Sequence, residues 1–373
     1  MSARNPFGRI AGIVLVGTHP WTNSAFDKLA PRPLLPVAHR PLLSYALHWL
    51  RDGGVRDAVV CANRETQVLE SRLHRHVPLG MTVSYQEDSM PRGAAGAVKD
   101  AADASDATVF VIADGTAIPN VDLADLLQAH HASRAAVTVV VHSEAERLVG
   151  KPSTPVPSGV YVFNRQVLDH VPASGFYDIK ETLIPQLHRA GERISPYSIS
   201  TPSPRVLDAS SYLAVNEWMV EHLVAAGARP EGYLKSGSSL FHRDAVIAPG
   251  AMFVGPVLVG PGAEIKSGAV IVGPTSIGRE ASIGSGVLIS RSAIWRRCMV
   301  NENAVTDRCI VGDDAVVPAG TQAFRQVRLA PVSYEPAFDR GIAQEPESAA
   351  PELLKRMSRA LLGTTWSRFP AAQ

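Results

Sequence analysis

The chain has 373 residues, of which 46% are hydrophobic and 19% charged, with a formal net charge of +1. This composition is typical of a globular protein, and the length favours two domains over one. The near-neutral charge and scattered basic residues exclude a nucleic-acid footprint or an anionic-membrane surface. No apolar run approaches the roughly 18 residues of a membrane-spanning helix.

Cysteine spacing and the first residues indicate the compartment. Cys61, Cys298 and Cys309 lie far apart and form no CxxC pair. They are predicted to be buried or idle thiols rather than a disulfide frame or a zinc site. Residues 1–9 are short and polar, without the apolar core of a signal peptide. A cytoplasmic location is therefore expected.

The first part of the chain alternates between short apolar runs and amphipathic stretches. Strands are predicted at residues 9–16, 55–62, 81–86, 108–113, 136–142 and 159–163. Helices are predicted at residues 42–51, 65–76, 93–104, 123–133, 179–189 and 210–226. The alternation predicts an α/β domain over residues 1–235, with helices on both faces of a parallel sheet. Such sheets bind ligands at the carboxyl ends of their strands.

A different period begins after a Gly-, Pro- and Ser-rich junction at residues 228–239. Apolar residues recur at every sixth position, at Ile247, Phe253, Val259, Ile265, Ile271, Ile277, Ile283 and Ile289. Four residues after each stands a small residue or valine, at Ala251, Val257, Ala263, Ala269, Thr275, Ala281, Val287 and Ala293. This hexapeptide pattern predicts a left-handed parallel β-helix over residues 236–324, whose stacked coils bury the large residues.

The repeat slips once and is predicted to resume with a second series. Its large residues are Met299, Val305, Val311 and Val317, and their small partners are Asn303, Cys309, Ala315 and Thr321. Residues 325–373 form a tail in which residues 353–362 have the spacing of an amphipathic helix. That helix is expected to pack on the protein, to cap the β-helix or to dock on a partner.

Three motifs in the first domain carry a family resemblance. Residues 30–45, APRPLLPVAHRPLLSY, are similar to the P-K-P-L-L-P-V-x-x-x-P-L-L-x-Y pattern of sugar-1-phosphate nucleotidyltransferases, with Arg32 in place of the lysine. Residues 91–97 and 158–163 are similar to that family's P-L-G-T-A-G-A and N-A-G-I-Y-V-F motifs. With the β-helix, the chain resembles the mannose-1-phosphate guanylyltransferase-like branch. The resemblance implies a Rossmann-like nucleotidyltransferase domain with a mixed, mostly parallel sheet.

The resemblance implies a reaction that depends on positive charge. Family members join a sugar phosphate to a nucleoside triphosphate with release of pyrophosphate, and positioning, cations and backbone donors supply the catalysis. Their glycine-rich loop carries an arginine, and two aspartates hold Mg²⁺. Aligned here, the loop keeps Gly17, but Thr18 and Pro20 replace the later glycines and Thr22 replaces the arginine. Proline has no N–H to offer a phosphate.

The magnesium positions also depart from the family pattern. The two aspartates align with Thr116 and Arg205, whereas Asp114 and Asp208 lie nearby but out of register. The family's E-K-P sugar-binding motif appears as residues 150–152, which keep Lys151 and lose the glutamate.

Several residues remain as candidates for the site. By resemblance, Arg32 and Lys151 are candidate catalytic residues, and Gly17, Gln86, Gly93 and Gly159 are candidates for binding nucleotide or sugar. Lys28 and Arg92 would add positive charge for phosphate, and Asp114 and Asp208 would hold Mg²⁺ if the protein is active. The structural alternative is that the glycines serve close packing, the basic residues are solvated surface charges, and Asp114 starts a turn.

Three functions are weighed on this basis. The preferred hypothesis is a catalytically impaired homologue in nucleotide-sugar metabolism, a regulatory or assembly subunit that binds a nucleotide or nucleotide sugar. It would assemble as a homo-oligomer through the β-helix or as a hetero-oligomer with an active paralogue. The alternative is an active pyrophosphorylase with a rearranged Mg²⁺ site. A hexapeptide acyltransferase is disfavoured because no histidine follows His242 to act as the general base.

Overall fold

The computed structural model describes residues 8–17, 24–63, 66–88, 92–143, 155–227 and 230–330. The chain forms two compact units, the first of Met1–Pro36 with Arg40–Leu207 and the second of Val37–His39 with Asp208–Gln373. In the ranges given, no helix combines the length and hydropathy needed to cross a membrane.

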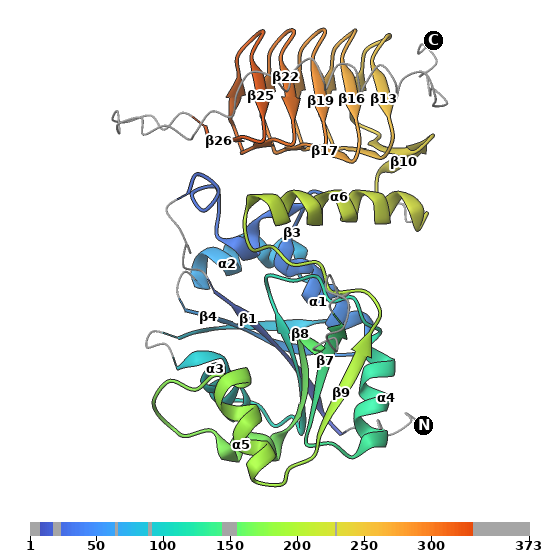
Figure 1. Cartoon of the computed structure of the whole chain (residues 1–373). Coiled ribbons are helices and arrows are strands. Elements are labelled where there is room, and N and C mark those ends of the chain that lie inside the picture. The colour runs from blue at the N-terminus through green and yellow to red at the C-terminus, as the bar shows by residue number, and fades with distance from the viewer. Residues whose placement is uncertain are drawn as a thin grey trace, which may run out of the picture. The chain divides into compact units, whose positions relative to one another are not determined.

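A seven-stranded mixed sheet forms the centre of the first unit, in the order β5-β4-β1-β6-β8-β7-β9 (Figure 1). Its strands are β1 (Ile10–Val16), β4 (Asp57–Ala62), β5 (Thr82–Glu87), β6 (Val109–Asp114), β7 (Val137–Ser143), β8 (Pro155–Asn164) and β9 (Ile194–Ile199). Strand β8 runs antiparallel to both β6 and β7, and the other neighbours are parallel. The expected mixed, mostly parallel sheet is confirmed.

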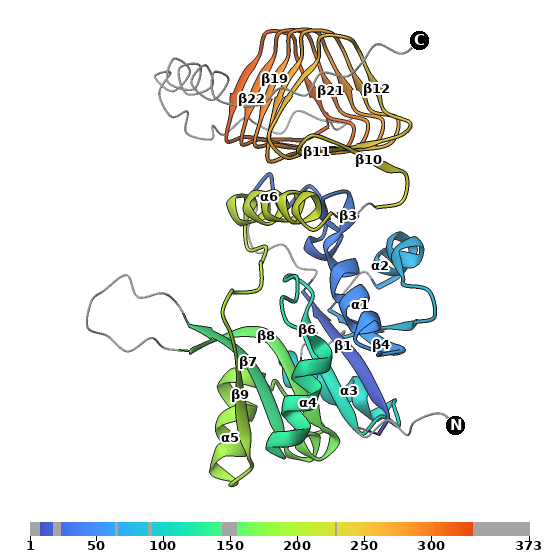
Figure 2. The same cartoon turned by 90° about the vertical axis from the view of Figure 1, so that its right-hand side faces the viewer.

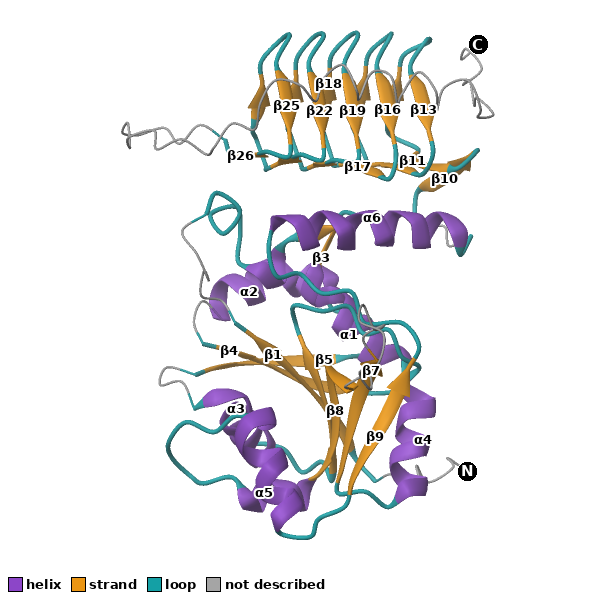
Figure 3. Ribbon diagram, viewed as in Figure 1, coloured by secondary structure: helices purple, strands orange, loops and turns teal. Residues whose placement is uncertain are grey.

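Helices cover both faces of this sheet, as the alternating pattern predicts (Figure 3). The helices are α1 (Leu42–Asp52), α2 (Thr66–Leu73), α3 (Gly93–Asp103), α4 (Leu123–Ser133) and α5 (Ile184–Arg189). Shorter elements are η1 (Arg32–Leu34), η2 (His74–His76), η3 (Arg165–His170), η4 (Ile179–Leu183), β2 (Pro36–Val37) and β3 (Arg40–Pro41). One buried cluster joins α1, α2 and α4 to the sheet, and another joins α3, η3, η4 and α5 to its other face.

The second unit contains helix α6 (Ala209–Ala225) and a parallel β-helix (Figure 2). One wall consists of β10 (Tyr233–Ser236), β11 (Ser239–His242), β14 (Val257–Val259), β17 (Thr275–Ile277), β20 (Ala293–Ile294), β23 (Ile310–Val311) and β26 (Val327–Arg328). A second wall consists of β12 (Val246–Ile247), β15 (Glu264–Ile265), β18 (Ser282–Ile283), β21 (Met299–Val300) and β24 (Val316–Val317). The third consists of β13 (Met252–Val254), β16 (Val270–Val272), β19 (Leu288–Ser290), β22 (Val305–Asp307) and β25 (Gln322–Phe324).

The register of the coils corrects one part of the sequence prediction. Early coils have 18 residues, so Ile247 pairs with Ile265, whereas later coils have 17, so Ile283 pairs with Val300. The interior series therefore continues at Ile294, Val300, Thr306, Val311, Val317 and Ala323, all buried. The prediction was wrong at Met299, which is 48% exposed, and at Val305, because one side of each later coil has five residues instead of six.

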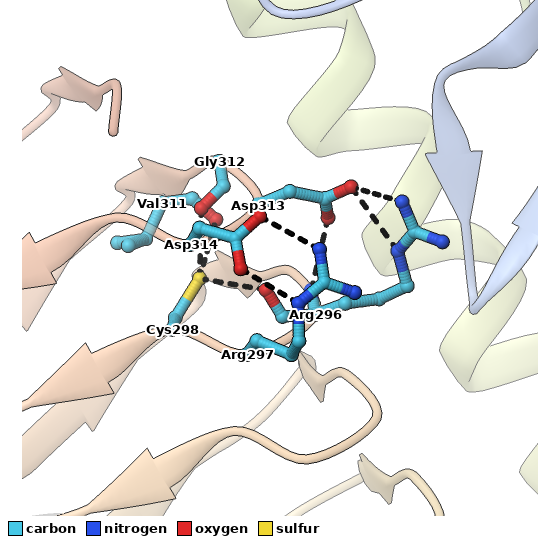
Figure 4. Close-up of polar contacts among 7 residues, drawn as sticks. All are labelled: Arg296, Arg297, Cys298, Val311, Gly312, Asp313 and Asp314. Atoms are coloured by element: carbon cyan, nitrogen blue, oxygen red, sulfur yellow. Dashed lines mark hydrogen bonds and ion pairs between the residues drawn. The ribbon is translucent and has the colours of Figure 1, made fainter. Parts of the chain in front are cut away.

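Small residues fill the places where the chain turns, as predicted, except that the change of register puts the buried Ala304 there in place of the exposed Asn303. Cys298 and Cys309 occupy two of these places and are buried, as is Cys61 in the first unit. The Cys298 thiol donates to the Gly312 carbonyl oxygen at 2.8 Å, and burial raises the pKa of this thiol to about 12. Next to Cys298 in the chain, Arg297 forms an ion pair at 2.6 Å with Asp314, which lies at the same position in the following coil (Figure 4). The prediction of buried thiols is confirmed.

Helix α6 packs on the β-helix through polar and aromatic contacts within the second unit. Trp295 Nε1 donates to Tyr212 Oη at 2.8 Å, and the two rings meet edge to face. Arg291 forms a bidentate ion pair with Glu217, in which Nη2 lies 2.6 Å from Oε2 and Nε lies 3.0 Å from Oε1. These contacts place the division between the units after Leu207, whereas the sequence analysis expected it at residue 235. The predicted helix at residues 353–362 lies outside the described residues.

Candidate functional site

A pocket of about 410 Å³ opens in the first unit where β1, β4 and β6 end. This is the edge at which a parallel sheet binds ligands. Its glycines and its polar or charged lining residues are Gly17, Cys61, Asn63, Asp88, Gly93, Asp114, Thr116, Gly159, Tyr161, Asp178, Lys180 and Arg205. The pocket thus contains three carboxylates and two basic side chains among the described residues.

Asp114, the last residue of β6, is held by its neighbours on both carboxylate oxygens. Its Oδ1 accepts hydrogen bonds from the Thr116 backbone N at 2.8 Å and from Thr116 Oγ1 at 2.7 Å. Its Oδ2 lies 3.1 Å from Nη1 of Arg205. The carboxylate is therefore fixed in one orientation and neutralised by a guanidinium.

Arg205 is fixed by a second contact. Its Nη2 donates to the Ser158 carbonyl oxygen at 3.1 Å. The side chains of Arg205 and Asp114 remain 27% and 30% exposed, so both face the pocket. A partly desolvated ion pair of this kind interacts more strongly than one on the open surface.

Gly159 provides the space for this ion pair. It adopts φ +88°, a region that favours glycine, and a Cβ there would lie 2.4 Å from Arg205 Nη2 and 2.9 Å from Asp114 Cβ. Gly93 also has a positive φ, and a Cβ there would meet the Tyr177 carbonyl oxygen at 2.6 Å. Both glycines are required by close approach, which agrees with the packing alternative and leaves them on the pocket wall.

The opposite wall is provided by η4 and the residue that caps it. Asp178 Oδ1 accepts from the backbone N of Lys180 and Glu181, at 2.7 and 3.0 Å. Lys180 is exposed and lines the pocket. Tyr161 also lines the pocket, and its burial, with a smaller effect of the Asp114 and Asp178 carboxylates, raises the pKa of its hydroxyl. Tyr161 therefore remains a neutral hydrogen-bonding group.

The structure gathers four of the eight predicted site residues at the pocket. Gly17, Gly93, Gly159 and Asp114 line it. Arg32 is instead buried in an ion pair with Asp27 at 3.2 Å, and Gln86 lies in β5 without lining the pocket. Lys151 lies outside the described residues.

Two further predicted cations, Arg92 and Lys28, and one predicted metal ligand, Asp208, also lie outside the pocket lining. Arg92 pairs with Asp100, and Lys28 is exposed without lining the pocket. Asp208 belongs to the second unit, where its Oδ1 accepts from the Ser211 backbone N at 2.8 Å and caps α6. Its carboxylate thus has a helix-capping role.

The pocket does not fit a resident Mg²⁺ ion. Mg²⁺ requires octahedral oxygen ligands, usually including carboxylates. The motif resemblance predicts Thr116 and Arg205 at the family's two aspartate positions, and both oxygens of Asp114 already have partners in the structure. Within the described ranges, no three His, Cys, Asp or Glu residues form a group able to hold a metal. A guanidinium lies where a second carboxylate would be needed.

Asp178 and Lys180 line the pocket but were not predicted from the sequence. A signal was available, because Asp178 and Glu181 have the D-x-x-E spacing that marks a helix N-terminus. Arg205 was noticed as the residue at the second aspartate position, but only the folded structure shows that it reaches Asp114.

The fold and the pocket define a nucleotidyltransferase-like domain joined to a β-helix, and comparisons agree with this class. A family model for nucleotidyl transferases matches residues 27–147, and a model for the GMPPB C-terminal domain matches residues 253–323. Residues 27–147 therefore match the nucleotidyl transferase family, and the chain is similar to mannose-1-phosphate guanylyltransferases.

Individual relatives share modest identity with the chain. The mannose-1-phosphate guanylyltransferase of Mycobacterium tuberculosis is 25% identical, over 69% of this chain and 77% of the relative. A mannose-1-phosphate guanyltransferase of Kluyveromyces lactis is 26% identical, over 68% of this chain and 72% of the relative. A crystal structure of HddC from Yersinia pseudotuberculosis has a TM-score of 0.48 at 14% identity, over 56% of this chain and 99% of that one. Both sequence matches therefore span most of the length of the relative.

Proposed function

We propose that this protein binds a nucleotide sugar in the first-unit pocket and serves as a catalytically impaired regulatory or assembly subunit. The observation that carries the proposal is the 3.1 Å ion pair between Asp114 and Arg205, the residue that aligns with the second magnesium aspartate of the family. A guanidinium at that place leaves no paired carboxylates to chelate a metal. The fold and the pocket, which binding requires, are retained.

The charges of the pocket wall support binding without turnover. Among the described lining residues, Asp88, Asp114 and Asp178 oppose only Lys180 and Arg205. A triphosphate in the act of losing pyrophosphate needs localised positive charge from side chains or metal. The loop after Gly17 adds none, since residues 18–26 contain no lysine or arginine.

The names of the relatives suggest the ligand. Several of them are mannose-1-phosphate guanylyltransferases, whose product is GDP-mannose. GDP-mannose is therefore the first probe for this pocket, followed by other nucleotide sugars and free nucleotides.

Turnover and binding are tested on the same preparation. Purified protein is mixed with GTP, mannose 1-phosphate and Mg²⁺, with the Mycobacterium tuberculosis relative as the positive control. We expect no pyrophosphate above the blank, together with an upward shift in melting temperature when GDP-mannose is added. Rapid pyrophosphate release contradicts the impairment, and the absence of any shift across the nucleotide-sugar panel contradicts the binding role.

A partial restoration gives a second test. The double variant Thr22→Arg, Thr116→Asp supplies a loop cation and one carboxylate but retains Pro20 and Arg205. It is expected to remain inactive, because Pro20 has no N–H for the phosphates and Arg205 still pairs with Asp114. Activity in this variant would show that loss of the two side chains alone explains the inertness.

A further inference from the structure

The Arg205 guanidinium is held in place and still has hydrogen-bonding capacity. A guanidinium carries five N–H donors. In the described part of the chain, its Nη1 meets Asp114 and its Nη2 meets the Ser158 carbonyl oxygen. These contacts leave donors for another acceptor, and the side chain is 27% exposed on the pocket wall.

The surroundings of Arg205 fix its position before any ligand arrives. Asp114, its partner, is itself oriented by two hydrogen bonds from Thr116. Gly159 leaves room that any Cβ would fill, since the Cβ position lies 2.4 Å from Arg205 Nη2. A preorganised cation of this kind binds an anion with little loss of side-chain entropy.

We propose that Arg205 is the resident cation of this pocket and binds the diphosphate of a nucleotide sugar without a divalent metal. The proposal rests on the proposed function and deepens it. Arginine contacts phosphate oxygens through paired N–H donors, and its charge persists at every physiological pH. In this arrangement Arg205 bridges Asp114 and the ligand, so that a side chain takes the place that a metal ion has between carboxylate and phosphate.

Calorimetric titration with GDP-mannose tests the proposal directly. The full chain is titrated once in excess EDTA and once in millimolar Mg²⁺. We expect the two dissociation constants to agree within about twofold, because a guanidinium is not removed by a chelator. Arg205→Gln should weaken binding by about tenfold or more in both buffers.

Three variants separate a role in binding from a role in folding. Arg205→Lys keeps the charge without the planar fork and should recover part of the affinity. Arg205→Asp places a second carboxylate beside Asp114 and should make any remaining binding depend on Mg²⁺. Arg165→Gln is the matched control, because Arg165 also donates to a backbone carbonyl, that of Ala107 at 2.7 Å, but lies outside the pocket. Melting temperatures are recorded for all variants.

The outcomes distinguish this inference from the function on which it rests. Wild-type binding that requires Mg²⁺ overturns the inference while the binding role survives. An equal loss of affinity in the Arg205→Gln and Arg165→Gln variants also overturns it, because that result assigns Arg205 a general structural role. Failure of the wild type to bind any nucleotide sugar in either buffer overturns both.

Discussion

The β-helix and the pocket have both departed from a regular pattern, with different consequences. In the β-helix the coil length falls from 18 to 17 residues, yet the interior series stays buried, with Ile294 and Thr306 taking the places that the new register gives them. In the pocket, Thr116 and Arg205 are predicted to stand at the family's two aspartate positions, so that a hydroxyl and a guanidinium replace two carboxylates. Packing depends on volume and on which face a residue occupies, whereas a metal site depends on the charge of a few atoms.

The largest expected effect tests the corrected register. Val300 is 1% exposed and its neighbour Met299 is 48% exposed. Val300→Asp buries an unpaired charge and should destabilise the protein by at least about 4 kcal/mol. Met299→Asp, the matched control, should cost no more than about 0.5 kcal/mol. Urea unfolding followed by circular dichroism measures both, and a larger loss for Met299→Asp would restore the uncorrected register.

The contact of α6 with the β-helix should be the next most sensitive. Trp295 is 5% exposed and packs edge to face on Tyr212. Trp295→Ala removes this ring and should cost about 3–5 kcal/mol in unfolding free energy. Trp295→Phe keeps a ring but loses the hydrogen bond to Tyr212, and about 1–2 kcal/mol is expected. Near-equal losses of unfolding free energy in the two variants would mean that the hydrogen bond to Tyr212, rather than ring packing, stabilises the contact of α6 with the β-helix.

His39, a half-buried residue whose Nε2 atom is buried, gives the second unit a pH dependence. The pKa of His39 is lowered to about 4, mainly by burial of the imidazole. The positive charges of Arg279 and His242 add to this decrease, and a hydrogen bond with the backbone of Ile277 opposes it. Since the unfolded chain binds this proton near pH 6.5 and the folded chain does not, stability falls as the pH drops from about 6.5 to 4. The loss should reach about 3 kcal/mol.

Urea unfolding between these pH values checks the prediction. His39 has φ +71°, a conformation that asparagine tolerates, so His39→Asn is the appropriate comparison. The variant should lose less stability than the wild type over the same interval. If the unfolding free energy falls equally with pH in the two proteins, protonation of His39 does not destabilise the folded protein and the prediction is wrong.

The smallest predicted effect concerns the pocket. Thr116→Val removes the Oγ1 hydrogen bond to Asp114 but keeps the bond from the backbone N. The unfolding free energy should fall by about 1 kcal/mol. Thr116→Ser retains the hydroxyl and is the control. A loss as large as that of Trp295→Ala would show that this pocket hydrogen bond stabilises the fold as strongly as the packing of a buried ring.

Local patterns predicted most elements but not the second register of the β-helix. The helix and strand periods placed β1, α1, β6 and α4 within a few residues of their observed bounds. The five-residue sides escaped detection because Met299 and Val305 are more apolar than Thr306, so composition favoured the wrong face. Strand β9 was missed because Ile194–Ile199 carries a proline and alternates weakly.

The sequence predicted four of the residues that line the candidate site but not the contacts among them. The family resemblance gave Gly17, Gly93 and Gly159 as candidate binding residues, and all three line the pocket. The pairing of Arg205 with Asp114 joins residues far apart in the chain and depends on the space at Gly159. Asp208 follows a helix-capping rule that competes with metal binding for the same carboxylate.

The most direct test of the account is a crystal structure of the full chain grown with GDP-mannose and Mn²⁺, with anomalous diffraction recorded for manganese. We expect diphosphate density against the Arg205 guanidinium, an intact Arg205–Asp114 ion pair, and no anomalous peak at Asp114. A manganese peak coordinated by Asp114, with Arg205 displaced from it, would contradict the central claim that a side chain has replaced the metal.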